Sequence, residues 1–215
     1  QIREAFAQLR EPVQLLFFGK KTDCDYCDAT RQLVEEVIAL SDKLSFSAHD
    51  LEEDRELARQ YRVDKAPSLV FASRNGEAIQ DYGIRFLGIP AGHEFSTLIH
   101  SLIMVSHRDS GLDKQTRDYL SKLAQPVHLQ VFVTPTCPYC PRAVVLAYQM
   151  ALESPLVEAE GIEATEFPEL ADRFHVSGVP QTTINAGAGT VVGAAPAEHL
   201  IAEIMRALGK EEISS

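Results

Sequence analysis

The first half of this chain alternates between two kinds of segment, which differ in the spacing of their hydrophobic and polar residues. Segments with the length and composition of strands stand at 12–18, 44–50, 68–72 and 77–82. Segments that space apolar residues three and four apart, as amphipathic helices do, cover 28–41, 53–62 and 91–106. Strands that alternate with helices in this way predict an α/β fold with helices packed on a central sheet.

The second half shows the same order of elements. Strands are expected at 127–133, 156–163, 181–185 and 190–193, and helices at 137–153, 166–175 and 196–208. A helix is also expected before the first strand of each half. Residues 107–114 are expected to connect the halves, and residues 209–215 to form a frayed tail. The sequence therefore predicts two tandem domains, 1–108 and 109–215, each with a mixed central sheet flanked by helices.

The two halves also repeat residue by residue. An offset of 113 carries Cys24 and Cys27 onto Cys137 and Cys140, with a tyrosine before the second cysteine of each pair. The same offset carries YRVDKAPS onto FHVSGVPQ without a gap, so each half has a proline 43 residues beyond its first cysteine. A register held over that distance indicates a duplicated unit with one site in each half.

Charge and hydropathy exclude several classes of partner. The chain has 20 basic and 31 acidic residues, a net charge of −11, which argues against nucleic acids and anionic membrane surfaces as partners. No apolar run approaches the roughly 20 residues that span a bilayer. We expect a cytoplasmic protein, and the first residue, Gln1, leaves open that a signal peptide was removed.

The four cysteines form two tight pairs, and none is left over. A disulfide that closes so short a loop adds little stability, so the pairs predict chemistry, with redox-active disulfides and no other cofactor. Disulfide exchange needs a thiolate and a second thiol near it, and a helix N-terminus stabilises the thiolate. We therefore expect Cys24 and Cys137 to be exposed nucleophiles, and Cys27 and Cys140 to be more buried resolving thiols.

A proline recurs at the start of a strand in each half. Pro67 follows Ala66, and Pro180 follows Val179, at equal distances beyond the cysteines. A proline there limits strand pairing, and a cis bond would make a bend that holds backbone groups beside the sulfurs. The sequence predicts that these two dipeptides contact the substrate.

Taken together, these motifs resemble a known family. Each half resembles the thioredoxin and glutaredoxin superfamily, and CPYC in the second half is the glutaredoxin-type sequence. Over nearly its whole length the chain resembles the two-domain protein disulfide oxidoreductases, glutaredoxin-like proteins of thermophilic prokaryotes. The resemblance implies a thioredoxin fold in each half, dithiol–disulfide exchange on protein substrates, and cis-prolines at Pro67 and Pro180 that face the cysteines.

The chain departs from thioredoxins at one position. Thioredoxins carry a buried aspartate on the strand six residues before the first cysteine, and this chain has Phe18 and Val131 there. Another group, such as water, must then accept the proton. Glu163 and Glu166, and their repeat partners Asp50 and Glu53, are candidates, although acids at such positions more often cap helices.

The two sites are expected to differ in redox properties. The first motif carries Asp25 and Tyr26 between its cysteines and further aspartates beside them, whereas the second carries Pro138 and Tyr139 and has Arg142 two residues on. Negative neighbours disfavour a thiolate, so Cys24 should have the higher pKa and the first pair should be more reducing. We place the second pair near roughly −200 to −230 mV, the glutaredoxin range, and expect it to be the principal site. The tyrosines either shape substrate contact or pack the rim.

Four interpretations of the motifs remain open. The first is a protein disulfide oxidoreductase acting as reductase, oxidase or isomerase. The second is a dedicated electron carrier between a flavin-dependent reductase and a peroxidase. The third is a partner-binding module without catalysis, and the fourth is a zinc site, although an entire domain separates the cysteine pairs. The chain has no dinucleotide-binding glycine motif, so we expect a flavin-dependent thioredoxin reductase as electron donor, protein disulfides as substrates and a peroxiredoxin as a further partner.

Overall fold

The computed structural model describes residues 1–209, so the expected tail at 209–215 lies outside the described residues apart from Gly209. The first half contains α1 (Ile2–Phe6), β1 (Val13–Gly19), α2 (Cys27–Ile38), β2 (Leu44–Asp50), α3 (Arg55–Gln60), β3 (Ser68–Asn75), β4 (Ala78–Leu87) and α4 (Glu94–His107). The second half contains α5 (Lys114–Leu120), β5 (Val127–Val133), α6 (Cys140–Glu153), β6 (Val157–Glu163), α7 (Pro168–Arg173), β7 (Gln181–Ile184), β8 (Gly189–Val192) and α8 (Ala197–Ala207). Every helix and strand expected from the sequence is present. None of the helices in residues 1–209 combines the length and apolarity that a membrane span requires.

The strands form one mixed sheet in the order β2-β1-β3-β4-β6-β5-β7-β8. β3 and β7 run antiparallel to their neighbours, and the pairs β1–β2, β4–β6 and β5–β6 are parallel. The predicted fold class, tandem thioredoxin-like domains with mixed sheets, is confirmed. The sequence did not predict that β4 and β6 pair, through 84–87 and 159–162, and join the two sheets into one.

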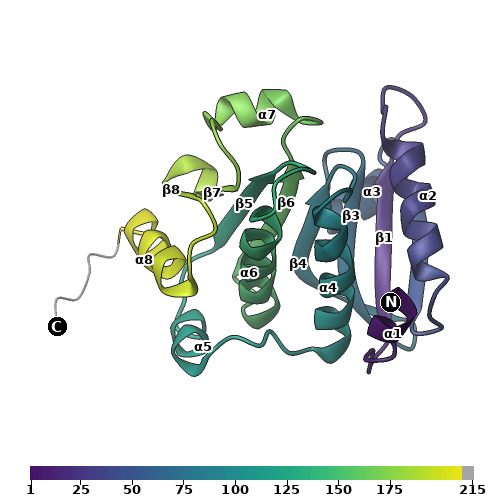
Figure 1. Ribbon diagram of the computed structural model, residues 1–215, viewed down its shortest axis with the longest axis horizontal. Coiled ribbons are helices and arrows are strands. Elements are labelled where there is room, and N and C mark those ends of the chain that lie inside the picture. Colours follow the sequence, from purple (N-terminus) through teal and green to yellow (C-terminus); the bar gives the residue numbers. More distant parts are fainter. Residues whose placement is uncertain (210–215) are drawn as a thin grey trace.

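Helices cover both faces of the sheet (Figure 1). On one face α2, α4, α6 and α8 share a single apolar core that runs through both halves, with Val34, Leu102, Val144 and Leu200 among its members. On the other face α3 and α7 cover two smaller cores, one in each half. The large core makes the two halves one packed body, because neither half could expose its share of that core to water without cost.

The junction between the halves is closely packed. Tyr148 on α6 donates a hydrogen bond to the carbonyl of Arg85 on β4, and its hydroxyl accepts one from the amide of Gly161 on β6. Gly161 packs on the ring of Phe86, where an added Cβ would lie 2.8 Å from a ring carbon. Arg85 is buried, and the carboxylate of Asp81 balances its charge through two hydrogen bonds of 2.8 and 2.6 Å.

Gly161→Ala should destabilise the protein by about 1–3 kcal/mol, because the methyl group overpacks the junction against a buried ring. Gly178→Ala is the matched control, since an added Cβ there meets nothing within 4 Å, and it should change stability by less than about 0.5 kcal/mol. Urea unfolding at constant pH measures both. Equal stability of the two variants would contradict the packing described for the junction.

Candidate active sites at the two cysteine pairs

Both cysteine pairs lie at the same edge of the sheet. β1 and β5 end shortly before them, and α2 and α6 begin at the second cysteine of each pair. In the structure Cys24 is bonded to Cys27 and Cys137 to Cys140, with Cα atoms 5.5 Å apart in each disulfide. The motif order strand, turn, cysteine pair and helix is therefore the same in both halves.

The two disulfides are far apart along this edge. Three strands, β3, β4 and β6, separate β1 from β5, which at about 4.8 Å per strand gives a spacing on the order of 19 Å. Figure 1 shows α4 between the two cysteine-bearing helices. Sulfur atoms must approach to about 2 Å to exchange a bond, so the pairs cannot react with each other in this arrangement. Nor can four sulfurs so placed surround one zinc ion.

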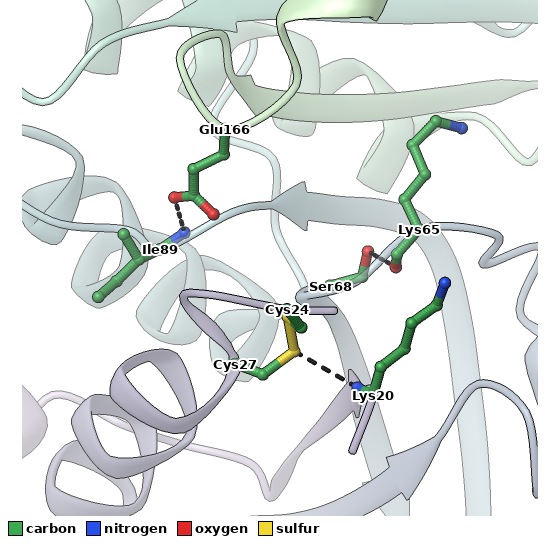
Figure 2. Close-up of a disulfide and its surroundings, with 7 residues drawn as sticks. All are labelled: Lys20, Cys24, Cys27, Lys65, Ser68, Ile89 and Glu166. Carbon is green, nitrogen blue, oxygen red and sulfur yellow. Dashed lines mark hydrogen bonds between the residues drawn. A yellow bond between two sulfur atoms is a disulfide. The ribbon is translucent and has the colours of Figure 1, made fainter. Parts of the chain in front are cut away.

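The first pair has one covered and one more accessible cysteine. Cys24 is half-buried and Cys27 is buried, and the backbone N–H of Lys20 donates to the Cys27 sulfur at 3.4 Å (Figure 2). Asp25 and Tyr26 are exposed, the tyrosine at 46%, so Tyr26 is available to a substrate and does not pack into the protein.

The second pair is more covered than the sequence predicts. Cys140 is fully buried as expected, but Cys137 is only 8% exposed, so the prediction of an exposed nucleophile is wrong for Cys137 in this disulfide form. The Cys137 sulfur turns back toward the start of α6, where it accepts the N–H of Cys140 at 3.1 Å. Pro138 and Tyr139 stay exposed, Tyr139 at 64%.

Each predicted proline directly precedes a strand that pairs with the strand leading to its cysteine pair. The Ala66–Pro67 and Val179–Pro180 bonds are both cis. β3 begins directly after Pro67, and its first residue, Ser68, pairs with Phe18 near the end of β1 and is drawn among the surroundings of the first disulfide in Figure 2. β7 begins after Pro180 in the same way and pairs with β5. In each half the cis-proline therefore lies at the end of the sheet that carries the cysteine pair.

The acidic residues that follow β2 and β6 have different roles. Asp50 accepts backbone N–H groups from the turn after β2, and Glu163 does so after β6, so both cap local turns. Glu53 pairs with Lys21 on the surface. Glu166 instead accepts the backbone N–H of Ile89 from the other half at 2.7 Å. Burial, together with the charge of Glu163, raises the pKa of Glu166 to about 7.

Sequence reasoning does not single out Glu94, the first residue of α4. It is 1% exposed, and burial raises the pKa of its carboxyl to about 7. One carboxyl oxygen accepts the hydroxyl of Thr97 at 2.6 Å, and the other has no hydrogen-bond partner within residues 1–209. The sequence does contain a signal that Glu94 is buried, since it stands on the same face of the helix as the buried Leu98 and Val105.

Glu94 lies at the edge of the sheet that carries the second pair. α4 packs against α6, and both helices begin at that edge. The N–H of His93 donates to the carbonyl of Pro135 at 2.9 Å, two residues before Cys137. A buried carboxyl with an unpartnered oxygen costs stability, and such groups concentrate at functional sites.

Comparison with solved structures gives matches over the whole chain. A protein disulfide oxidoreductase from Aeropyrum pernix K1 is 30% identical, with a TM-score of 0.88 over 99% of this chain and 93% of that one. A mutant form of the alkylhydroperoxide reductase AhpF from Enterococcus faecalis is 28% identical, with a TM-score of 0.84 over 94% of each chain.

Curated proteins match this chain over part of their length. The alkyl hydroperoxide reductase AhpF from Staphylococcus aureus is 26% identical over 83% of this chain and 32% of its own length. A protein named NADH dehydrogenase from Bacillus subtilis is 28% identical over 71% of this chain and 27% of its own. This chain therefore spans about a third of the curated relatives it matches.

The family assignment follows from these findings and the geometry. Residues 127–206 match the thioredoxin domain family. The match to the Aeropyrum protein covers both halves. The chain therefore belongs to the two-domain protein disulfide oxidoreductases of the thioredoxin superfamily, and is a thiol–disulfide oxidoreductase with two Cys-x-x-Cys pairs.

Proposed function

We propose that the chain reduces protein disulfides through mixed disulfides, that both pairs act separately, and that Cys137–Cys140 is the principal pair. The observation that carries this ranking is the N–H of Cys140 directed at the Cys137 sulfur at 3.1 Å. A donor at a helix N-terminus stabilises a thiolate more than a thiol. At the first pair the N–H that reaches a sulfur belongs to Lys20, directly after β1, and it contacts the resolving sulfur of Cys27 instead.

The proposed reaction balances within one pair. The Cys137 thiolate attacks a substrate disulfide, forming a mixed disulfide and releasing one substrate thiolate. Cys140 loses its proton and attacks the Cys137 sulfur, which releases the second thiolate and leaves the Cys137–Cys140 disulfide. Two electrons have then passed to the substrate, and an external dithiol must reduce the pair again.

Two sets of residues are proposed to support these steps. The dipeptides Ala66–Pro67 and Val179–Pro180 would hold the substrate backbone beside each pair, with Tyr26 and Tyr139 at the exposed rim. Glu94 is the proposed acceptor for the Cys140 proton, because it begins α4, which packs against α6 at the end of the sheet that carries Cys140. Its pKa of about 7 suits transfer near neutral pH. At the first pair a polar cavity of about 300 Å³ reaches Cys27, so water is the proposed acceptor there.

Asp25 and Pro138 are proposed to set the difference in thiol pKa and reduction potential between the two pairs. The proposed domain bounds are 1–108 and 109–215. The reduced Cys137 thiol should have a lower pKa than the Cys24 thiol, because the carboxylate of Asp25 opposes a thiolate at Cys24 and the α6 amide favours one at Cys137. Thiolate absorbance at 240 nm, in variants that keep one pair, gives both values. A lower pKa at Cys24 would contradict the ranking.

A second candidate is an electron carrier between a flavin-dependent reductase and a peroxidase. It is favoured by the similarity to the alkyl hydroperoxide reductase AhpF along most of this chain. A thioredoxin reductase and a peroxiredoxin, with no cofactor on this chain beyond its disulfides, would then be the partners. A cytosolic location suits either candidate, because thiols are kept reduced there.

Peroxide-dependent NADPH oxidation separates the two candidates. The carrier predicts fast turnover only when reductase, this chain and peroxiredoxin are all present, with weak reduction of insulin. The general reductase predicts insulin reduction by dithiothreitol without any of these partners.

A further inference from the structure

A cavity of about 510 Å³ is lined by residues of both halves, and two of them, Lys65 and Glu166, are drawn among the surroundings of the first disulfide in Figure 2. One wall is Lys65 of the first half, and the rest comes from the second half, namely Glu166, Phe167, Pro168, Glu169, Leu170 and Arg173. Its volume falls within the roughly 300–1,000 Å³ typical of ligand-binding pockets. Neither half contains this cavity alone.

Two of the lining residues, Lys65 and Glu166, are connected by hydrogen bonds to the segments around Pro67. Lys65 stands two residues before Pro67, and its carbonyl accepts the hydroxyl of Ser68 at 2.6 Å (Figure 2). On the other side Glu166 binds the N–H of Ile89, and the preceding residue, Gly88, donates its own N–H to the carbonyl of Pro67 at 2.9 Å. A chain bound at Cys24 and Pro67 therefore has the cavity next to it.

The lining selects one kind of side chain. Phe167 and Leu170 are partly buried and pack on the small core beneath α7, and Pro168 adds apolar surface. Charged groups of both signs, Lys65, Glu169 and Arg173, stand around them. An apolar side chain fits such a lining, while the charged groups can bind the polar backbone on either side of it.

Within residues 1–209, the second pair lacks a side chain at the position that corresponds to Lys65. The repeat partner of Lys65 is Gly178, where an added Cβ would meet nothing within 4 Å. β6 of the second half lies beside β4 and covers its outer edge. By contrast β8, the repeat partner of β4, is the last strand of the sheet. The difference between the two sites thus follows from their places in the sheet.

We propose that the first pair acts on polypeptide disulfides whose chain places an apolar side chain, a few residues from the reacting cysteine, in this interdomain cavity. The inference rests on the proposed disulfide reductase function and adds substrate selection to it. The first pair then discriminates among polypeptides by sequence, and the second pair accepts them broadly.

Single-turnover reduction of peptide disulfides tests this in the full chain with Cys137→Ser and Cys140→Ser. The probes are symmetric disulfides of short serine-rich peptides, each with one cysteine and with leucine placed in turn at each position up to four residues from it. One position should raise the rate constant about tenfold over the all-serine peptide, as burial of a leucine side chain allows. Leu170→Trp, which fills the cavity, should remove that gain while oxidised glutathione and the all-serine peptide react within twofold of before.

Two controls isolate the cavity. Leu57→Trp makes the same change at the repeat partner of Leu170, on α3, and should leave the gain intact. The chain with Cys24→Ser and Cys27→Ser, which keeps only the second pair, should show no gain at any position.

The outcomes separate the two proposals. Equal rates for all peptides with the first pair, a gain that survives Leu170→Trp, or the same gain with the second pair would overturn the role of the cavity. If the first pair reduces neither oxidised glutathione nor any peptide, the proposed function of that pair fails as well.

Discussion

Cys137→Ser should remove at least nine-tenths of the insulin-reducing activity of the protein, whereas Cys24→Ser should leave at least half of it. The Cys137 sulfur lies at the N-terminal end of α6 and accepts an amide hydrogen bond, so its thiolate forms more readily at neutral pH and attacks faster. The assay is the precipitation of insulin chains with dithiothreitol as reductant.

A double variant serves as the control for the serine variants. Because the pairs are about four strand spacings apart, or on the order of 19 Å, loss of one should leave the other unchanged in rate. The residual activity of Cys137→Ser should therefore match that of the double variant Cys137→Ser with Cys140→Ser. Greater loss from Cys24→Ser than from Cys137→Ser would contradict the ranking of the pairs.

Glu94→Gln should slow turnover at the second pair by about 100-fold near pH 7, the lower end of what general acid–base catalysis contributes. In the proposed mechanism an ionised Glu94 accepts the Cys140 proton, and burial raises the pKa of its carboxyl to about 7. Turnover of the second pair alone should rise with pH through about 7, and this rise should be absent in the variant. The first pair, kept alone, serves as control and should be unaffected.

Glu94→Gln should raise the free energy of unfolding, although it slows turnover. The folded protein holds the Glu94 proton up to about pH 7, whereas the unfolded chain releases it near the ordinary value of 4.5. The unfolded state thus binds fewer protons in this window, and Glu94 makes the protein less stable as pH rises from about 4.5 to 7. Glu94→Gln should therefore gain stability over the unsubstituted protein across that window, as urea unfolding measures.

This pair of results distinguishes a role in proton transfer from a structural one. A residue retained for stability would lower both the free energy of unfolding and the activity when replaced. An activity loss without a change in the pH profile would contradict the role of Glu94 as proton acceptor.

Much of the fold could be predicted because the pattern is local and repeated. The apolar run of β5 gives its bounds directly, and the register of the cysteines and prolines predicts one unit in each half. The end of β4 could not be predicted in this way. The expected strand stops at 82, but β4 continues to Leu87, past Gly83 at φ +73° and the buried Arg85. Arg85 is accommodated only because Asp81 and the carbonyl of Tyr61 bind it, which the linear pattern does not show.

The parts of the site that could not be predicted are contacts between the halves. Glu94 belongs to the first half but lies at the edge where α6 begins, and Glu166 belongs to the second half but binds beside Pro67. Both depend on the pairing of β4 with β6. A repeat detected in the sequence indicates two like units and carries no information on which edges of those units meet.

The reduction potential of each pair, in chains that keep only that pair, tests the central claim that the two sites are redox-active and unequal. Equilibration with glutathione buffers and separation of thiol and disulfide forms gives both values. The account predicts a second pair near roughly −200 to −230 mV and a first pair more reducing by at least about 30 mV, a tenfold difference in equilibrium constant. Equal potentials, or a first pair more oxidising than the second, would contradict it.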